Sequence, residues 1–357
     1  MPMNINDFLA QLVRIDGVSD LHFKVGSPPL LRINGELRPA KFQKLTPQNT
    51  RDIALSLVNE NVREKFDELR DFDTAYSVPG VARFRVNLFR QRGTLGVVLR
   101  KIPLEVPTLD KLGMPETIKK LAMEERGMVL VTGVTGSGKS STLAGMINHI
   151  NQHKRVHILT IEDPIEFLYS DNMAAINQRE VGLDTESFAT SLRAALRQDP
   201  DVILVGEMRD VETISIAIKA AETGHLVFST LHTLDATETV NRIIDSFPPH
   251  QQGQIRYQLA STLKGVISQR LLPRSDGRGR IAAVEVMVCT ELIKEYIIDP
   301  DKTMKIKDAI ENGKMQYGMQ SFDQHLTELY RNNDITLETA VAAAASPADF
   351  QRALMFQ

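Results

Sequence analysis

One short segment constrains the fold of this chain more than any other. The sequence GMVLVTGVTGSGKSSTLAGMINHI places Gly133, four further residues, and then Gly138, Lys139 and Ser140 between an apolar run and a helical run. This spacing is the P-loop pattern in the strand–loop–helix context that it requires. Glycines let backbone N–H groups converge on phosphate oxygens, and the following helix adds its positive N-terminus. We expect Lys139 to reach the β- and γ-phosphates of a nucleotide and Ser140 to ligate Mg²⁺.

Two strand ends in the second half of the chain carry carboxylates. From about residue 117 onward, apolar strands alternate with helical segments, which is typical of a parallel α/β sheet. Glu162 and Asp163 follow the run HILTI, and Glu207 follows the run VILV. Ligands of such sheets bind at the carboxyl ends of the strands, where a carboxylate can orient or deprotonate water. We therefore expect both glutamates at the phosphate site, although a solvated acid is the alternative for either one alone.

A third strand of this half brings two histidines into consideration. His225 stands at the beginning of the run HLVFST, and His232 follows its end. A single histidine near a strand is more often structural than functional. The place of His232 at the end of a neighbouring strand nevertheless makes a phosphate-sensing role the second interpretation.

The first hundred residues predict a mixed α+β unit. DFLAQLVRI and TRDIALSLVNENVREKFDEL have helical apolar spacing, and LLRINGEL predicts a hairpin with Asn34 and Gly35 at its turn. RFRVNLFRQRGTLGVVLRK alternates with period two and predicts a second hairpin with a basic outer face. Its inward residues are Phe84, Val86 and Leu88, and its outward residues are Arg83, Arg85, Asn87 and Phe89.

Prolines separate the two halves of the sequence. Pro103, Pro107 and Pro115, together with Gly113, interrupt any regular element. We therefore expect an N-terminal domain over 1–100, a linker over 101–112 and a second domain over 113–357.

Composition excludes several classes of protein. The chain is 42% hydrophobic and 24% charged, which is ordinary for a globular protein and unlike a disordered or fibrous one. Neither a membrane-spanning apolar run nor a secretion signal is evident, so a cytoplasmic location is expected. The single cysteine, Cys289, permits no internal disulfide and no CxxC zinc site. A formal net charge of -3 argues against a general nucleic-acid binder.

Several motifs together resemble one protein family. GVTGSGKSST, ILTIEDPIEF, LRQDPDVILVGEMRD and GHLVFSTLHT resemble, in this order, the Walker A, Asp box, Walker B and His box of the type II/IV secretion ATPases. SDLHF and GSPPLLRINGEL resemble the first-domain motifs of the same family. The resemblance implies an α/β fold in which a PAS-like α+β domain precedes a RecA-like P-loop ATPase domain with C-terminal helices. It also implies a homohexameric motor that hydrolyses ATP with Mg²⁺.

The resemblance also implies roles for individual residues. Glu207 would be the Walker B glutamate and share the metal with Ser140, and Glu162 would be the Asp-box carboxylate. Gly206 stands where many P-loop enzymes carry a metal-binding Asp, so Glu162 can share the general-base role. The remaining assigned residues are the His-box pair His225 and His232, the phosphate-reaching arginines Arg85 and Arg100, and the ATP-binding stretch Gly133, Val134, Thr135, Gly136, Ser137, Gly138, Lys139, Ser140, Ser141 and Thr142.

Within the family, the sequence resembles the pilus retraction ATPases of twitching motility. Extra N-terminal domains and a four-cysteine zinc insertion, usual in assembly ATPases, are lacking. The C-terminal Ala-Ile-Arg-x-Gly element is present from Ala309 to Gly313 but carries Glu311 in place of the arginine. The resemblance implies work at the cytoplasmic face of the inner membrane, peripheral to it, on a pilus platform protein and without nucleic acid.

Three alternatives stay open at this point. A related motor could power pilus assembly, protein export or conjugative transfer. A nucleic-acid translocase could use the basic strip from Arg83 to Lys101, although Phe84 and Phe89 lie on opposite faces of it. A nucleotide-dependent regulator of such a motor is the third.

Overall fold

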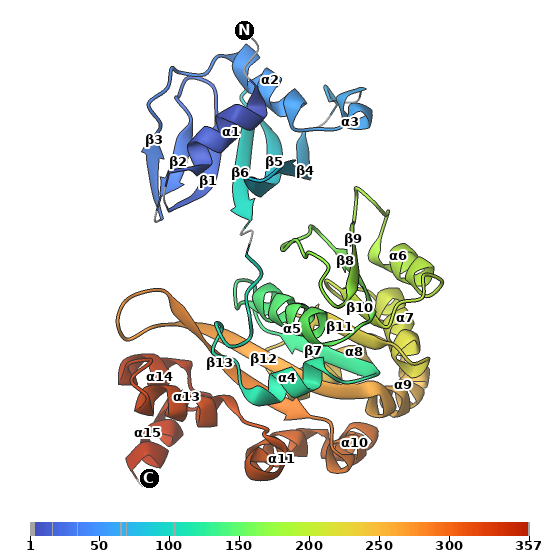
Figure 1. The fold of residues 1–357 in the computed structure, drawn as a ribbon. Helices are drawn as coiled ribbons and strands as arrows, with labels where there is room; N and C mark the ends of the chain where they lie inside the picture. Colours follow the sequence, from blue (N-terminus) through green and yellow to red (C-terminus); the bar gives the residue numbers. More distant parts are fainter. Residues whose placement is uncertain are drawn as a thin grey trace. The chain divides into compact units, whose positions relative to one another are not determined.

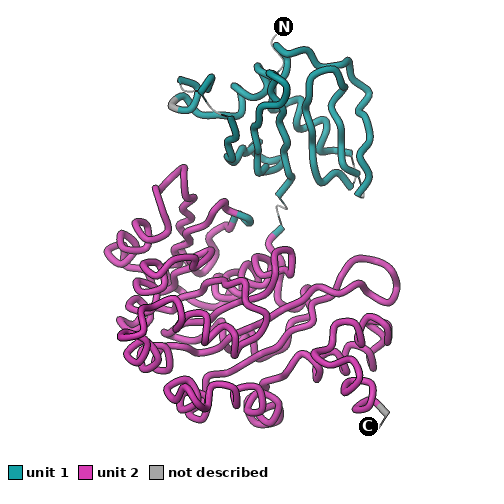
Figure 2. The backbone as a smooth tube through the Cα atoms, turned by 180° about the vertical axis from the view of Figure 1, so that it is seen from behind, with its two compact units in different colours: residues 1–105, 166–168 teal, residues 106–165, 169–357 magenta. Residues whose placement is uncertain are grey.

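The computed structural model describes residues 4–15, 17–33, 35–64, 66–68, 70–102 and 105–355. Contacts divide the chain into two compact units (Figure 2). Unit 1 comprises residues 1–105 and 166–168, and unit 2 comprises residues 106–165 and 169–357.

Unit 1 is an antiparallel sheet covered by helices. Its strands lie in the order β3-β2-β1-β6-β5-β4. Their bounds are β1 (Val18–Phe23), β2 (Leu30–Ile33), β3 (Glu36–Pro39), β4 (Asp71–Val78), β5 (Ala82–Gln91) and β6 (Thr94–Ile102). The helices are α1 (Ile5–Val13), α2 (Pro47–Ser56) and α3 (Glu60–Glu64).

The hydrophobic pattern explains this arrangement. Phe84, Val86 and Leu88 of β5 are buried in one core together with Leu9 of α1 and Ile53 of α2, as the period of two predicts. The hairpin of β5 and β6 is confirmed, and so is the hairpin of β2 and β3. Of the two turn residues predicted for the latter, Asn34 lies outside the described residues.

Unit 2 is built on a mainly parallel sheet. Its strands lie in the order β13-β12-β7-β11-β10-β8-β9, and only β12 and β13 pair antiparallel (Figure 1). Their bounds are β7 (Gly127–Thr132), β8 (His157–Glu162), β9 (Ala175–Glu180), β10 (Val202–Val205), β11 (Leu226–Leu231), β12 (Leu263–Pro273) and β13 (Arg280–Val288). The predicted fold class, α+β followed by α/β, is therefore confirmed.

Helices cover both faces of this sheet. On β7, Met128 and Leu130 belong to one apolar cluster while Val129 and Val131 belong to another, so the strand is buried on both sides. The helices between the strands are α4 (Glu116–Ala122), α5 (Lys139–His153), α6 (Phe188–Ala195), α7 (Val211–Glu222), α8 (Ala236–Asp245) and α9 (Pro249–Thr262).

The chain ends in a helical region, as predicted. It comprises α10 (Glu291–Ile298), the 3-10 helix η1 (Pro300–Lys305), α11 (Ile306–Asn312), α12 (Lys314–Tyr317), α13 (Phe322–Arg331), α14 (Leu337–Ala343) and α15 (Pro347–Met355). Within the part of the chain that the structure describes, every helix is too short or too polar to span a membrane.

The predicted linker over 101–112 overlaps an element of unit 1. Lys101 and Ile102 are the last residues of β6 rather than part of a connection. Pro103 and Leu104 lie outside the described residues. Residues 105–112 contain turns and bends without a regular helix or strand.

Candidate active site

The predicted phosphate loop lies between β7 and α5, at the carboxyl edge of the parallel sheet (Figure 1). Gly136 and Gly138 have φ of +80° and +95°, a left-handed conformation that favours glycine. Gly138 is the N-cap of α5, and Lys139 begins the helix. The loop therefore presents exposed backbone at a helix N-terminus, which suits an anionic phosphate chain.

Lys139 lies across this loop. Its Nζ donates to the carbonyl oxygens of Gly133 at 2.7 Å and Val134 at 3.1 Å. Burial lowers the pKa of Lys139, and the negative charge of Glu207 opposes that shift. The lysine is thus held at the loop and lies within the electrostatic field of the candidate catalytic carboxylate.

A buried glutamine braces the loop from β12. Gln269 donates from Nε2 to the carbonyl of Ser137 at 2.6 Å, and its Oε1 accepts from the Thr142 hydroxyl at 2.8 Å. Gln269 is 1% exposed. Sequence reasoning missed this residue, because an isolated glutamine more than a hundred positions from the loop carries no motif.

Glu207 follows β10 and is held by two partners. His232 Nε2 lies 3.0 Å from its Oε1, and Arg209 Nη2 lies 2.8 Å from its Oε2. Burial raises the pKa of Glu207, but the hydrogen bonds and charges of Arg209 and His232 outweigh it, so the net shift is downward. Glu207 is therefore a carboxylate at neutral pH, positioned beside an imidazole.

Glu162 is the last residue of β8, the strand next to β10. Its Oε1 accepts from the Thr160 hydroxyl at 2.7 Å and from Gln178 Nε2 at 3.2 Å. A Cβ added at Gly206 would lie 3.2 Å from the Ile161 carbonyl oxygen and 3.4 Å from the Cα of Glu162. This close approach of two backbones explains the small residue at position 206, where an aspartate would be crowded.

His225 and His232 stand at the two ends of β11. His232 follows β11 at the edge that carries the P-loop, whereas His225 precedes β11 at the opposite edge. The ring of His225 is 2.9 Å from the carbonyl oxygen of Ala220. Six residues of strand span roughly 20 Å, so within this chain the two histidines lie at opposite ends of β11, as their places in the sequence indicate, and a role for His225 at the nucleotide site stays a prediction.

Arg85 and Arg100 belong to unit 1. They are direct cross-strand partners on β5 and β6, which brings two guanidinium groups to one face of the sheet. Arg100 Nε donates to Asp20 Oδ1 at 2.9 Å, and both arginines are exposed. Burial raises the pKa of Asp20, but its partners Arg100 and Ser19 lower it more.

A cavity of about 780 Å³ adjoins the P-loop within unit 2. Gly138, Ser141 and Thr142 line it on the loop side, and Leu271 and Ile281 line it from the β12–β13 hairpin. Its position suits the nucleoside part of a nucleotide whose phosphates bind the loop.

Among the described residues, the structure contains no cluster of three or more His, Cys, Asp or Glu side chains able to hold a metal ion. Mg²⁺ at nucleotide sites usually takes one or two protein oxygens and completes its shell with phosphate and water. The exposed Ser140 at the start of α5 and the carboxylate of Glu207 fit that donor set.

Comparison with known proteins agrees with these features. The family model "Type II/IV secretion system protein" matches residues 77–350. The type IV pilus retraction ATPase PilT of Pseudomonas aeruginosa is 45% identical over 348 residues, covering 98% of this chain and 100% of PilT. The type IV pilus ATPase PilU of the same organism is 42% identical, covering 96% and 89%. The crystal structure of the pilus retraction motor PilT with bound ADP has a TM-score of 0.90 at 46% identity, covering 98% and 99%. This chain therefore belongs to the type II/IV secretion system protein family.

Proposed function

We propose that this chain is an ATP-hydrolysing motor that retracts type IV pili. The observation that carries the proposal is the meeting of the P-loop with Glu207 at one edge of one sheet, in a chain that matches PilT along its whole length. The ATPase activity follows from the loop and the carboxylate. The coupling to pilus retraction follows from the similarity to PilT, which is a retraction motor.

The chemistry divides among residues of unit 2. Backbone N–H groups of the loop and the N-terminus of α5 bind the phosphates. Glu207 orients and deprotonates the attacking water, and His232 fixes the position of its carboxylate. Glu162 adds a second carboxylate at the neighbouring strand end. Lys139 leaves the loop carbonyls and turns to the phosphates when the nucleotide binds.

Two further groups complete the proposed reaction. Ser140 and Glu207 would hold Mg²⁺, which would supply positive charge at the phosphate oxygens. Arg85 and Arg100 supply positive charge to the transferring phosphoryl group, an effect worth roughly 10³ to 10⁵ in rate where an arginine finger has been measured.

Mechanical work requires that ATP favour one arrangement of the protein over another. We propose that six copies form a ring at the cytoplasmic face of the inner membrane and act on a pilus platform protein there. Each cycle of binding and hydrolysis then displaces the platform and draws pilin subunits from the base of the fibre.

A single-residue variant tests the assignment in cells. Lys139→Ala removes the phosphate contact, so cells that carry it are expected to keep long pili and to lose twitching. Normal pilus shortening in this variant would contradict the proposal. Bald cells after deletion of the gene would favour a pilus assembly motor instead.

A further inference from the structure

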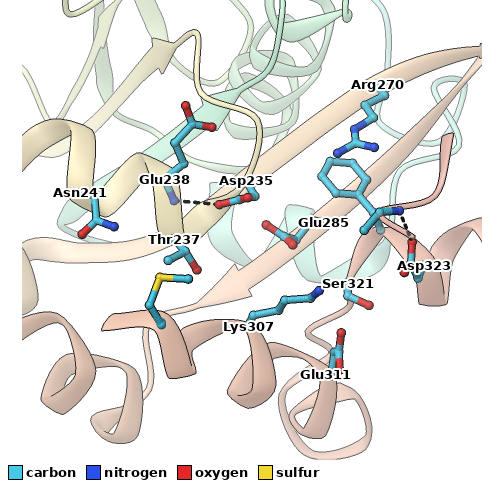
Figure 3. A pocket seen from close by; sticks show the side chains of 13 residues that line it. Asp235, Thr237, Glu238, Asn241, Arg270, Glu285, Lys307, Glu311, Ser321 and Asp323 are labelled. Carbon is cyan, nitrogen blue, oxygen red and sulfur yellow. Dashed lines mark hydrogen bonds between the residues drawn. The ribbon is translucent and has the colours of Figure 1, made fainter. Parts of the chain in front are cut away.

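A second pocket lies away from the P-loop, under the start of α8. It has a volume of about 340 Å³. Five segments build it: the N-terminal turn of α8, the β12–β13 hairpin, α11 with the preceding η1, the start of α13, and Ala345 after α14 (Figure 3). We name it the acidic pocket.

The charges of the acidic pocket are unbalanced. Two cations, Arg270 and Lys307, line it. Among the described residues, no ion pair joins either cation to a carboxylate of the pocket. The carboxylates that line it are Asp235, Glu238, Glu285, Glu311 and Asp323.

Glu285 is the deepest of these carboxylates. It is 5% exposed, and its Oε1 accepts one hydrogen bond, from the backbone N–H of Ala236 at 2.8 Å. Its second oxygen has no hydrogen-bond partner among the described residues, and its carboxylate faces the centre of the pocket (Figure 3). Burial raises the pKa of Glu285 to about 7, against its ordinary value of 4.5. A buried carboxylate of this kind is stabilised when a cation is brought to it.

Backbone groups fix the neighbouring carboxylates in place. Asp235 accepts from the N–H of Glu238 at 2.7 Å, and Glu238 in turn accepts from the N–H of Leu234 at 2.7 Å. Asp323 accepts from the N–H of Ala345 at 3.1 Å. Each keeps acceptor capacity on its remaining lone pairs, so the acidic wall exists before any ligand binds.

The two cations of the pocket offset only part of its negative charge: Arg270 and Lys307 both lower the pKa of Glu285, but burial raises it more. Arg270 stacks over the Phe322 ring at 4.1 Å and donates to the carbonyl oxygen of Ala343 at 2.6 Å. Lys307 is exposed on α11 and has no hydrogen-bond partner among the described residues. The pocket therefore retains a surplus of negative charge.

The lining of the acidic pocket includes one largely exposed methionine. Met304 is 74% exposed at its edge. Met315 and Tyr317 on the adjacent α12 are 96% and 43% exposed. Flexible methionines beside an exposed aromatic ring are typical of protein-binding surfaces, and they suit the methylene stem of a lysine or arginine.

We propose that the acidic pocket binds a lysine or arginine side chain from a segment of a partner protein. The charged head would meet Glu285 and Glu311, and the stem would pack on Met304. The identity of the partner rests on the proposed function: a motor at a membrane meets cytoplasmic loops, which carry an excess of Lys and Arg. A basic cytoplasmic loop of the pilus machinery is thus the expected occupant.

Fluorescence anisotropy with the full-length protein tests the pocket directly. The probe is a fluorescein-labelled peptide with two lysines flanked by leucines, and its twin has both lysines replaced by glutamine. We expect the lysine peptide to bind, and to bind more weakly as ionic strength rises. The glutamine peptide is expected not to bind.

Three variants locate the binding site. Glu311→Lys replaces an attraction by a repulsion in an exposed side chain, and it is expected to weaken peptide binding about tenfold or more. Glu285→Gln keeps an oxygen for the N–H of Ala236, and it is expected to weaken binding several-fold. Asp245→Lys makes the matched charge reversal at the far end of α8 and is expected to leave binding unchanged. Equal affinity in all three variants, or no binding to the wild type, would overturn the proposal.

ATP hydrolysis is measured on the same samples. A protein that hydrolyses ATP but does not bind the lysine peptide rejects the acidic pocket and leaves the proposed function standing. A protein that binds the peptide through Glu311 but does not hydrolyse ATP rejects the proposed function and leaves the acidic pocket standing. Thermal unfolding of each variant separates lost binding from lost folding.

Discussion

Two glutamates of unit 2 show how differently the same side chain can be held. Glu207 has two cationic or polar partners, Arg209 and His232, and its pKa is lowered although burial opposes the shift. Glu285 has one backbone N–H as its partner, and burial raises its pKa to about 7. The balance of burial against partners therefore decides which carboxylate is fully ionised: the partners outweigh burial at Glu207, and burial outweighs the partners at Glu285. The first is suited to activate water, and the second is suited to receive a cation.

The largest expected effect concerns Glu207, the first carboxylate of this comparison. Glu207→Gln keeps the shape of the side chain but cannot accept a proton, so we expect ATP turnover to fall by about 10² to 10⁴ while nucleotide binding persists. Steady-state phosphate release and equilibrium ADP binding measure the two quantities. Glu222→Gln on the exposed part of α7 is the control. A turnover rate near wild type would remove Glu207 from the catalytic role.

The second prediction concerns Glu285 and the pH dependence of stability. Because the folded-state pKa of Glu285 is raised from 4.5 to about 7, its protonation stabilises the fold fully below pH 4.5, and this contribution is lost as the pH rises through 7. The loss is up to about 3 kcal/mol. Urea unfolding at several pH values should show this slope in the wild type and a flatter one in Glu285→Gln. Identical slopes would mean that Glu285 titrates normally.

The third prediction concerns the brace beneath the nucleotide loop. Gln269→Leu leaves the Ser137 carbonyl and the Thr142 hydroxyl without their partner, at a cost of about 1 to 3 kcal/mol. We expect a lower melting temperature and about tenfold weaker ADP binding. Gln254→Leu on the exposed side of α9 should change neither measurement. Unchanged ADP affinity in Gln269→Leu would show that the loop holds its shape alone.

The smallest expected effect concerns Arg209, one of the two partners of Glu207. Arg209 lowers the pKa of Glu207 but is itself largely exposed, so water screens much of its influence. In Arg209→Ala the pKa of Glu207 rises, and the acidic limb of the ATPase pH profile should move to higher pH by less than about one unit. A shift toward lower pH would contradict the assigned sign.

The sequence predicted those parts of the site that depend on local order. The P-loop and Glu207 follow apolar strands directly, so the edge on which they lie can be deduced from strand direction alone. Local order also indicates that His225 and His232 lie at opposite ends of one strand, and the structure agrees. The contact of Lys139 with the loop carbonyls could not be predicted from the sequence, because it depends on the side-chain rotamer and leaves no sequence pattern.

Long-range contacts account for what the sequence did not reveal. Gln269 reaches the P-loop only because β12 pairs with β7. The acidic pocket collects charged side chains from separate segments, and of these only Glu311 stands in an element that the sequence singled out. Such groups meet through strand order and helix packing, which depend on the whole unit.

Strand β12 separates the two sites by the thickness of one backbone. Gln269 lines the nucleotide side and Arg270 lines the acidic pocket, because consecutive residues of a strand point to opposite faces. Any movement of the strand that follows the phosphate loop must carry Arg270 with it, and with it the ring of Phe322 and the start of α13. The backbone of β12 therefore connects the nucleotide side directly to the acidic pocket.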